Sequence, residues 1–233
     1  MPYKLSPSKI GLFTDCPRCF WLAEHKVWKR PSGIFPSLPS GMDRILKNHF
    51  DKFIGKGLPP ELCESRRAGS RAGATCASLS VPECKGMRLF GEGGEKELLD
   101  VWRNNFRGIR FEDRKGNVLF GAVDNILVNG KKLVVLDYKT RGFPLKEDTH
   151  THYQLQLDLY NYLLEKNGYK TENYGFLLFY VPDEVTKTGE VVFDTTLVKM
   201  KDEPEKAEKV WKKALKLLDG DCPSKVCQWC ERV

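Results

Sequence analysis

The sequence predicts an α/β protein in which a mixed central sheet is flanked by helices, and three observations predict it. The chain has 233 residues, 41% of them hydrophobic, and this length is enough for one large core or two small ones. Its periodicities run as helices, then three strands, a helix and two more strands, an order typical of a sheet covered by helices. Residues 174–181 are nearly all apolar, as in a strand at the centre of a sheet.

The N-terminal part is expected to be helical. Ser6 is a helix cap and Pro7 suits the first helical position, so we predict a helix from Pro7 to Trp28. A proline-rich loop follows, and a second helix is predicted over residues 40–54. Residues 1–56 would then form an N-terminal helical lobe. Residues 57–94 have no sustained periodicity and are predicted to be a flexible insertion.

Residues 95–220 carry the periodicities of the core. A helix is predicted over residues 95–106, where Leu98, Leu99, Trp102 and Phe106 share a face. The predicted strands are residues 109–112, 118–128, 133–139, 174–181 and 191–200. Two further helices are predicted over residues 150–167 and 203–218. All 233 residues are therefore expected to form a single domain.

The predicted hairpin between residues 118 and 139 carries the strongest chemical signal. Its arms are joined through Asn129-Gly130, a pair typical of two-residue hairpin loops. With that loop, residue 124 lies opposite residue 135, and Asp137 is a diagonal neighbour of Asp124. Asp124, Asp137 and Lys139 then share one face. An odd loop length would separate them.

Two carboxylates and a lysine on a half-buried face need a physical explanation. Paired like charges are unfavourable there unless a cation neutralises them. Mg²⁺ and Mn²⁺ prefer oxygen ligands and keep positions open for water and phosphate. The alternative is a solvated hairpin with ordinary surface charges. The triplet follows a buried run, Leu133 to Leu136, and this position favours the metal site.

The helix predicted after the hairpin adds Gln156 and Tyr160, which are four residues apart and share a face. Three motifs thus follow one another: Gly121-x-x-Asp124, Asp137-x-Lys139 and Gln156-x-x-x-Tyr160. They resemble the RecB-like branch of the PD-(D/E)XK nuclease superfamily, which includes CRISPR-associated exonucleases. The resemblance covers about residues 108–201, and each motif alone is short.

The resemblance implies a restriction-endonuclease-like fold with residues 95–220 as the nuclease core. It implies that Asp124 and Asp137 hold catalytic Mg²⁺ or Mn²⁺, with the backbone carbonyl of Tyr138 as a further ligand. Lys139 would be the catalytic lysine. Gln156 and Tyr160 would position the scissile strand, with Gln154 as a register alternative to Gln156.

The chain departs from this pattern on its early helix. Members of the branch often carry a metal-binding histidine four residues after a glycine, whereas here Ile45 stands four residues after Gly41. His49, one turn further on, is the nearest histidine and is a candidate ligand. The alternative is a surface histidine whose ring nitrogens already have hydrogen-bond partners and bind no metal. One-metal and two-metal catalysis therefore both remain open.

The eight cysteines form a second pattern. No apolar signal peptide and no membrane-spanning segment is evident in the sequence, so a cytoplasmic protein is expected and a metal site is preferred over disulfides. Five cysteines lie near the termini, where residues 221–233 would form a clasp with the first helix and limit fraying. These five are Cys16, Cys19, Cys222, Cys227 and Cys230.

The resemblance implies a 4Fe-4S cluster with one early and three late cysteines, which favours Cys16, Cys222, Cys227 and Cys230. Symmetric Cys-x-x-Cys pairing replaces Cys222 by Cys19 and suits Zn²⁺ equally well. Both choices remain open. The other cysteines, Cys63, Cys76 and Cys84, fall in the predicted insertion, match no metal template and are expected to be incidental.

The formal charge of +7 favours a polyanionic partner. The leading hypothesis is a Mg²⁺- or Mn²⁺-dependent deoxyribonuclease, an exonuclease on single-stranded DNA or DNA ends. Partners in CRISPR adaptation or recombinational repair are equally compatible. A catalytically inactive DNA-binding or assembly subunit is the alternative, and a zinc-ribbon-type interaction protein is a third hypothesis.

Overall fold

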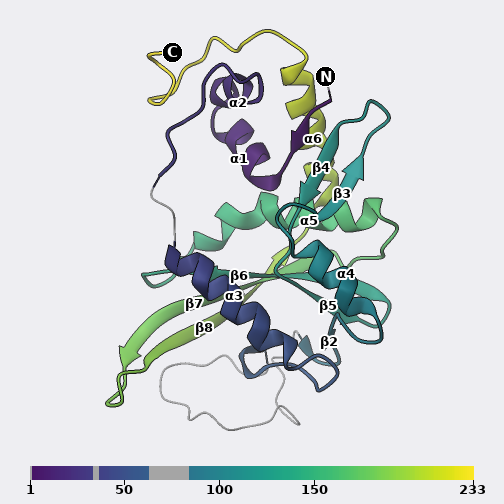
Figure 1. Cartoon of the computed structure of the whole chain (residues 1–233), viewed down its shortest axis with the longest axis vertical. Coiled ribbons are helices and arrows are strands. Elements are labelled where there is room, and N and C mark those ends of the chain that lie inside the picture. Colours follow the sequence, from purple (N-terminus) through teal and green to yellow (C-terminus); the bar gives the residue numbers. More distant parts are fainter. Residues whose placement is uncertain (1, 34–36, 63–83) are drawn as a thin grey trace.

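Figure 1 shows a computed structural model of the protein, which describes residues 2–33, 37–62 and 84–233. The α/β class predicted from the sequence is confirmed, but the strands form two mixed sheets where one was predicted. The larger sheet has the order β2-β5-β6-β7-β8, and β6 and β7 are its parallel pair. Its strands are β2 (Arg88–Leu89), β5 (Asn125–Asn129), β6 (Lys132–Thr140), β7 (Tyr174–Val185) and β8 (Val191–Lys201).

The smaller sheet has the order β1-β4-β3, with β1 parallel to β4. Its strands are β1 (Lys4–Leu5), β4 (Val118–Gly121) and β3 (Ile109–Glu112). The α-helices are α1 (Pro7–Asp15), α2 (Pro17–Glu24), α3 (Ser37–Asp51), α4 (Glu95–Trp102), α5 (Gln154–Lys166) and α6 (Pro204–Leu218). Short 3-10 helices occupy η1 (Pro60–Leu62) and η3 (Thr149–Tyr153). Within these described ranges, no helix combines the length and apolarity needed to cross a membrane.

The helices cover both faces of the larger sheet. Alternate residues of β6, Leu133 and Val135, belong to the core shared with α5 and α6. The residues between them, Val134 and Leu136, belong to a second core shared with α3. Figure 1 shows α3 against the sheet at one end of the molecule, with α1, α2, α6 and the C-terminal segment at the other. The period of two along β6 therefore decides which side chains face α5.

Two predicted elements are each divided in the structure. The helix predicted from Pro7 to Trp28 breaks between α1 and α2, where Cys16 is extended at φ −151°. Pro17 lacks an N–H and cannot continue a helix, but it suits the first position of α2. The strand predicted over residues 118–128 also divides, because β4 and β5 belong to different sheets.

Other boundaries shift by a few residues. The helix predicted over residues 40–54 is α3 (Ser37–Asp51), and the one predicted over residues 95–106 ends at Trp102. The helix predicted over residues 150–167 begins with the 3-10 turn η3 before α5.

The segment predicted to be a flexible insertion, residues 57–94, lies partly outside the described residues, at positions 63–83. Its C-terminal part, residues 84–94, is ordered, because β2 pairs with β5 and Leu89 is buried. Leu58 and Leu62 at the other end are buried as well. The packed core therefore begins before residue 95.

Candidate active site

The β5–β6 hairpin places Asp124 and Asp137 next to each other. Asn125 pairs with Leu136 and Asn129 with Lys132, so the two-residue loop is Gly130 and Lys131. Gly130 has a positive φ of 57°, which glycine adopts without strain. The predicted register was wrong by two residues. Because two is even, the faces are unchanged, and continuing the register places residue 124 opposite residue 137.

Residues 122–124, which join β4 of the smaller sheet to β5 of the larger one, are held by contacts with the end of α4. The amide of Val123 donates to the carbonyl of Trp102 at 3.2 Å, and the Arg103 guanidinium donates to the backbone carbonyl of Asp124 at 2.8 Å. Arg103 is fixed in turn by Asp51, 2.7 Å away. The Asp124 carboxylate accepts the backbone N–H of Tyr138 at 2.9 Å. These contacts fix Asp124 at the end of β6.

Asp137 is a buried carboxylate, with 1% of its surface exposed. Burial and then the nearby Asp124 raise the pKa of Asp137 to about 7, although Lys139 acts in the opposite direction. The ammonium of Lys139 lies 2.5 Å from Asp137 Oδ2. Even beside Lys139, this carboxyl has a raised pKa, so a second cation would be needed to keep it fully ionised near neutral pH.

A side-chain network joins Lys139 to α5. Gln156 accepts from the Lys139 ammonium at 3.0 Å and donates to the Tyr160 hydroxyl at 2.8 Å and to Asp137 at 3.3 Å. The same ammonium lies 4.6 Å from the centre of the Tyr153 ring. Burial, and then Asp137 and Asp124, raise the pKa of Tyr160 well above its ordinary value, so this phenol stays protonated.

Gly121 is required by the packing of Tyr160. A Cβ at this position would lie 2.6 and 2.9 Å from carbons of the Tyr160 ring. Gly121 is buried at the end of β4, so neither its backbone nor the Tyr160 ring can move away freely. The glycine of the Gly-x-x-Asp motif therefore has a steric role, since it lets the tyrosine of the last motif approach the strand.

Replacement of Gly121 by alanine is expected to destabilise the protein by about 1–3 kcal/mol, because the added methyl group overlaps the Tyr160 ring. Urea denaturation followed by fluorescence would measure this loss. Gly142→Ala is the matched control, since nothing lies within 4 Å of its added Cβ and its φ is not positive. Equal stabilities of the two variants would contradict the steric role.

Helix α3 contributes two residues that the motifs did not identify. The Lys47 ammonium lies 3.2 Å from Asp124 and 2.9 Å from Asp43. Burial lowers the pKa of Lys47, but the two carboxylates outweigh it and raise that pKa. Burial and then Asp124 raise the pKa of Asp43. The site therefore has a third carboxylate, and its i,i+4 spacing from Lys47 was the available sequence signal.

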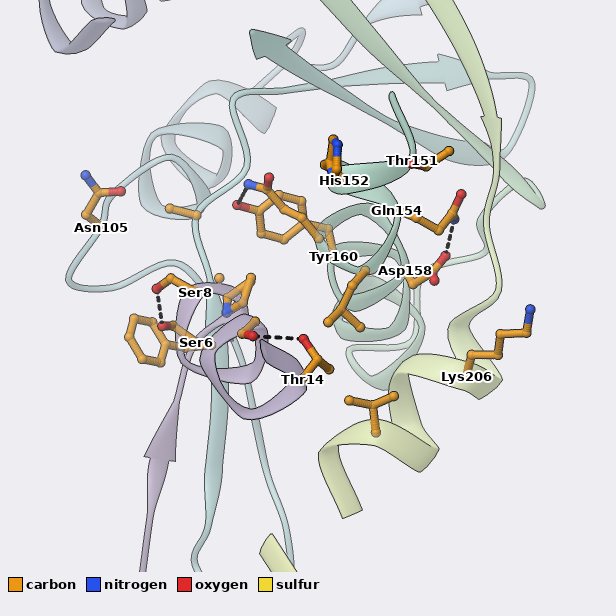
Figure 2. A pocket seen from close by; sticks show the side chains of 18 residues that line it. Ser6, Ser8, Thr14, Asn105, Thr151, His152, Gln154, Asp158, Tyr160 and Lys206 are labelled. Carbon is orange, nitrogen blue, oxygen red and sulfur yellow. Dashed lines mark hydrogen bonds between the residues drawn. The ribbon is translucent and has the colours of Figure 1, made fainter. Parts of the chain in front are cut away.

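Two hollows reach the site. A groove of about 950 Å³ is lined by Gly121, Gln156 and Tyr160 together with the start of α1. Figure 2 shows Ser6, Ser8 and Thr14 on its α1 wall, with His152 and Gln154 on the side of α5. A smaller cavity of about 210 Å³ lies on the α3 side and is lined by residues that include Asp43 and Lys139.

Two of the predicted site side chains, Gln154 and His49, have other surroundings, as does the side chain of Tyr138, whose backbone carbonyl was the predicted ligand. Gln154, the register alternative, donates to Asp158 and to the carbonyl of Lys201, both at 2.7 Å. His49 lies 3.0 Å from Glu61 and packs edge-on against Phe53. Neither set of contacts includes Asp124 or Asp137. The Tyr138 side chain points to the α3 core, where its hydroxyl accepts from Asn125.

The terminal cysteines converge at the end of the molecule that holds α1, α2 and the C-terminal segment (Figure 1). The sulfurs of Cys16, Cys19, Cys227 and Cys230 all lie within 4.8 Å of one another. The Sγ–Sγ distance is 3.9 Å for Cys16–Cys230, 3.5 Å for Cys19–Cys227 and 3.8 Å for Cys227–Cys230. Of the two ligand sets left open by the sequence, the structure brings together the symmetric one. Such a group suits a metal ion.

The remaining cysteines do not join this group. Cys222 lies 3.5 Å from the Arg18 guanidinium and is not among the four converging sulfurs. Cys84 is buried in the core beneath α3. Cys63 and Cys76, which were expected to be incidental, lie outside the described residues.

Comparison with known protein families gives a match over almost the whole chain. A family model described as the PD-(D/E)XK nuclease superfamily matches residues 4–232, a span that includes the carboxylates and all four converging cysteines. No curated protein matches the chain.

Proposed function

This chain belongs to the PD-(D/E)XK nuclease superfamily, and we propose that it hydrolyses phosphodiester bonds of DNA with Mg²⁺ or Mn²⁺ bound at Asp124 and Asp137. One observation carries the proposal. Asp137 is buried beside a second carboxylate, and the ammonium of Lys139 lies 2.5 Å from it. That arrangement is unfavourable for a purely structural site and suits metal-assisted chemistry on an anionic substrate.

The residues fit a divalent cation. Asp137 and Asp124 supply carboxylate oxygens at adjacent positions, and Asp43 supplies another from α3. Oxygen donors of this kind are those that Mg²⁺ and Mn²⁺ prefer. Lys47 already lies between Asp43 and Asp124, so this position attracts positive charge. The backbone carbonyl of Tyr138 is proposed as a further ligand.

Each protein group has a proposed role in hydrolysis. When bound, the ion would supply a Lewis acid that polarises the phosphate and lowers the pKa of a water molecule. Lys139 would orient the attacking water and offset the charge that develops on phosphate oxygens. Gln156 holds the Lys139 ammonium at 3.0 Å and so fixes its position. Tyr160, protonated and at the groove, would donate to the scissile strand.

The groove supports a nucleic-acid strand as the substrate. Its lining offers hydroxyl and amide groups and the ammonium of Lys206, which are groups that contact phosphates and sugars without reading sequence. The net charge of +7 favours such a polyanion. Because Asp137 is almost fully buried, a single strand or a frayed end would reach it more easily than a duplex. We therefore propose exonuclease activity on single strands or ends.

A DNA-binding or assembly subunit without catalysis is the alternative, and one observation favours it. Ile45, exposed to 51%, occupies the position where the resembled branch often has a histidine ligand. His49, the nearest histidine in the sequence, lies 3.0 Å from Glu61. Against this alternative, a binding module has no need for Asp124, Asp137 and Lys139 together.

Cleavage assays on end-labelled substrates test the proposal. The purified protein would be incubated with linear single-stranded DNA, blunt duplex, circular single-stranded DNA and single-stranded RNA. Each reaction would contain Mg²⁺, Mn²⁺ or a chelator. Asp137→Ala and Lys139→Ala proteins, purified identically, control for contaminating nucleases. We expect linear single-stranded DNA to be degraded with Mg²⁺ or Mn²⁺ only, and by the unaltered protein only.

Other outcomes would revise the proposal in defined ways. Cleavage of the circular strand would replace the exonuclease by an endonuclease. Cleavage confined to RNA would change the substrate. Binding of DNA without cleavage, equal in all three proteins, would support the inactive subunit and reject the enzyme.

A further inference from the structure

The spacing of the four converging cysteines distinguishes a single metal ion from a multi-iron cluster. We propose that Cys16, Cys19, Cys227 and Cys230 bind a single Zn²⁺ through four thiolates, in place of the four-iron cluster that the family resemblance implied. This inference concerns the terminal clasp and does not depend on the nuclease activity proposed above.

The distances between sulfurs match those around one ion. With a Zn–S bond of 2.3 Å, a regular tetrahedron places its sulfurs about 3.8 Å apart. The measured separations are 3.9, 3.8 and 3.5 Å, and no pair exceeds 4.8 Å. The geometry of a mononuclear centre is therefore present in the fold.

A four-iron cluster fits this group poorly. Each thiolate of such a cluster binds a different iron atom, and iron and sulfide fill the space between the sulfurs. The ligands must then lie well apart, which these sulfurs do not. The expected one-plus-three ligand set also fails, because Cys222 is held at 3.5 Å by Arg18 while Cys19 lies inside the group. Two Cys-x-x-Cys pairs are the pattern typical of structural zinc.

The surroundings compensate the charge of such a centre. Four thiolates outnumber the two positive charges of Zn²⁺, so the site needs donors to its sulfurs. The backbone amide of Cys19 donates to Cys16 at 3.5 Å, and that of Cys227 donates to Cys230 at 3.4 Å. Arg30 donates to the Cys227 sulfur at 3.5 Å. The Arg30 side chain is held at Asp15, so the positive charge is fixed there.

Metal analysis of the intact protein tests the assignment. The chain would be produced with both iron and zinc supplied, and it would be purified without oxygen to protect any cluster. Zinc, iron and acid-labile sulfide would then be quantified per chain and the visible spectrum recorded. Cys19→Ser and Cys222→Ser are a matched pair of single-thiol variants. Exchange for Co²⁺ provides a spectroscopic measure of tetrahedral thiolate ligation.

We expect about one zinc per chain, a colourless protein, and Co²⁺ absorption typical of tetrahedral thiolates. Cys222→Ser should keep full zinc content and the Co²⁺ spectrum, whereas Cys19→Ser should lose or weaken both. Iron in the protein, either as a single ion or with sulfide in a brown cluster, would overturn the proposal. Metal loss in Cys222→Ser with full retention in Cys19→Ser would overturn the ligand set. None of these measurements depends on DNA cleavage.

Discussion

Replacement of Asp137 by asparagine is expected to lower the rate of metal-dependent cleavage by about 10³-fold while DNA binding is retained. Asparagine keeps the shape of the side chain and can still accept from Lys139. It removes the negative charge that would hold the cation, and a neutral amide oxygen is a much weaker ligand. Single-turnover cleavage and fluorescence anisotropy with labelled single-stranded DNA would measure the two quantities separately.

The same substitution should make the metal-free protein more stable, although it lowers the rate of cleavage. Burial and Asp124 raise the folded-state pKa of Asp137 from 3.8 to about 7. Raising an acid's pKa means that the folded state holds the proton more tightly. The wild type therefore loses stability as the pH rises from about 4 to 7, by at most on the order of 4 kcal/mol. The amide of the Asp137→Asn variant cannot ionise, so the variant lacks this loss.

Thermal unfolding in chelator at pH 5 and pH 8 would measure this effect. Asp137→Asn should be more stable than the wild type, and by a larger margin at pH 8. Asp183→Asn removes an exposed carboxylate and is the control for the general effect of charge. Mn²⁺ should stabilise the wild type much more than Asp137→Asn. An Asp137→Asn protein that cleaves at the wild-type rate, or whose margin is the same at both pH values, would disprove the proposed role.

The pair Asp124 and Asp137 was predictable because its geometry is local. Both residues lie within a few positions of one hairpin loop, and alternation along a strand fixes which face each occupies. The predicted register was off by two residues, since Asn129 is paired with Lys132 and the loop is Gly130–Lys131. An even shift preserves the faces along the paired strands, so Asp124 still lies close enough to Asp137 to raise its pKa. A shift of one would have separated the two carboxylates.

The contribution of α3 could not be predicted in the same way. Asp43 and Lys47 are roughly eighty residues from Asp124, and their contact depends on α3 packing against the opposite face of the sheet from α5. No local periodicity records that arrangement. The break between α1 and α2 is different, since Pro17 marks it in the sequence and a stricter use of the proline rule would have predicted it.

Replacement of Cys230 by alanine is expected to lower the free energy of unfolding by several kcal/mol, because a structural ion links its binding energy to folding. For a chain of this length that loss lowers the melting temperature by roughly 10 °C. Cys230 is fully buried, and its sulfur lies 3.9 Å from that of Cys16, which is 214 positions away. Cys222→Ala, outside the four sulfurs, is the matched control and should change stability little.

The loss should begin at the two termini and reach the groove through α1. Arg18 donates to the carbonyls of Pro223 and Val233, and Trp21 donates to that of Gly220, so α2 and the C-terminal segment hold each other. Limited proteolysis with mass spectrometry should therefore cut Cys230→Ala near both ends first. Since α1 forms one wall of the groove, KM for DNA should rise more than kcat falls. A uniform loss of kcat at unchanged KM would show that the clasp acts on the carboxylate site itself, because the role expected of α1 is to line the groove that receives the strand.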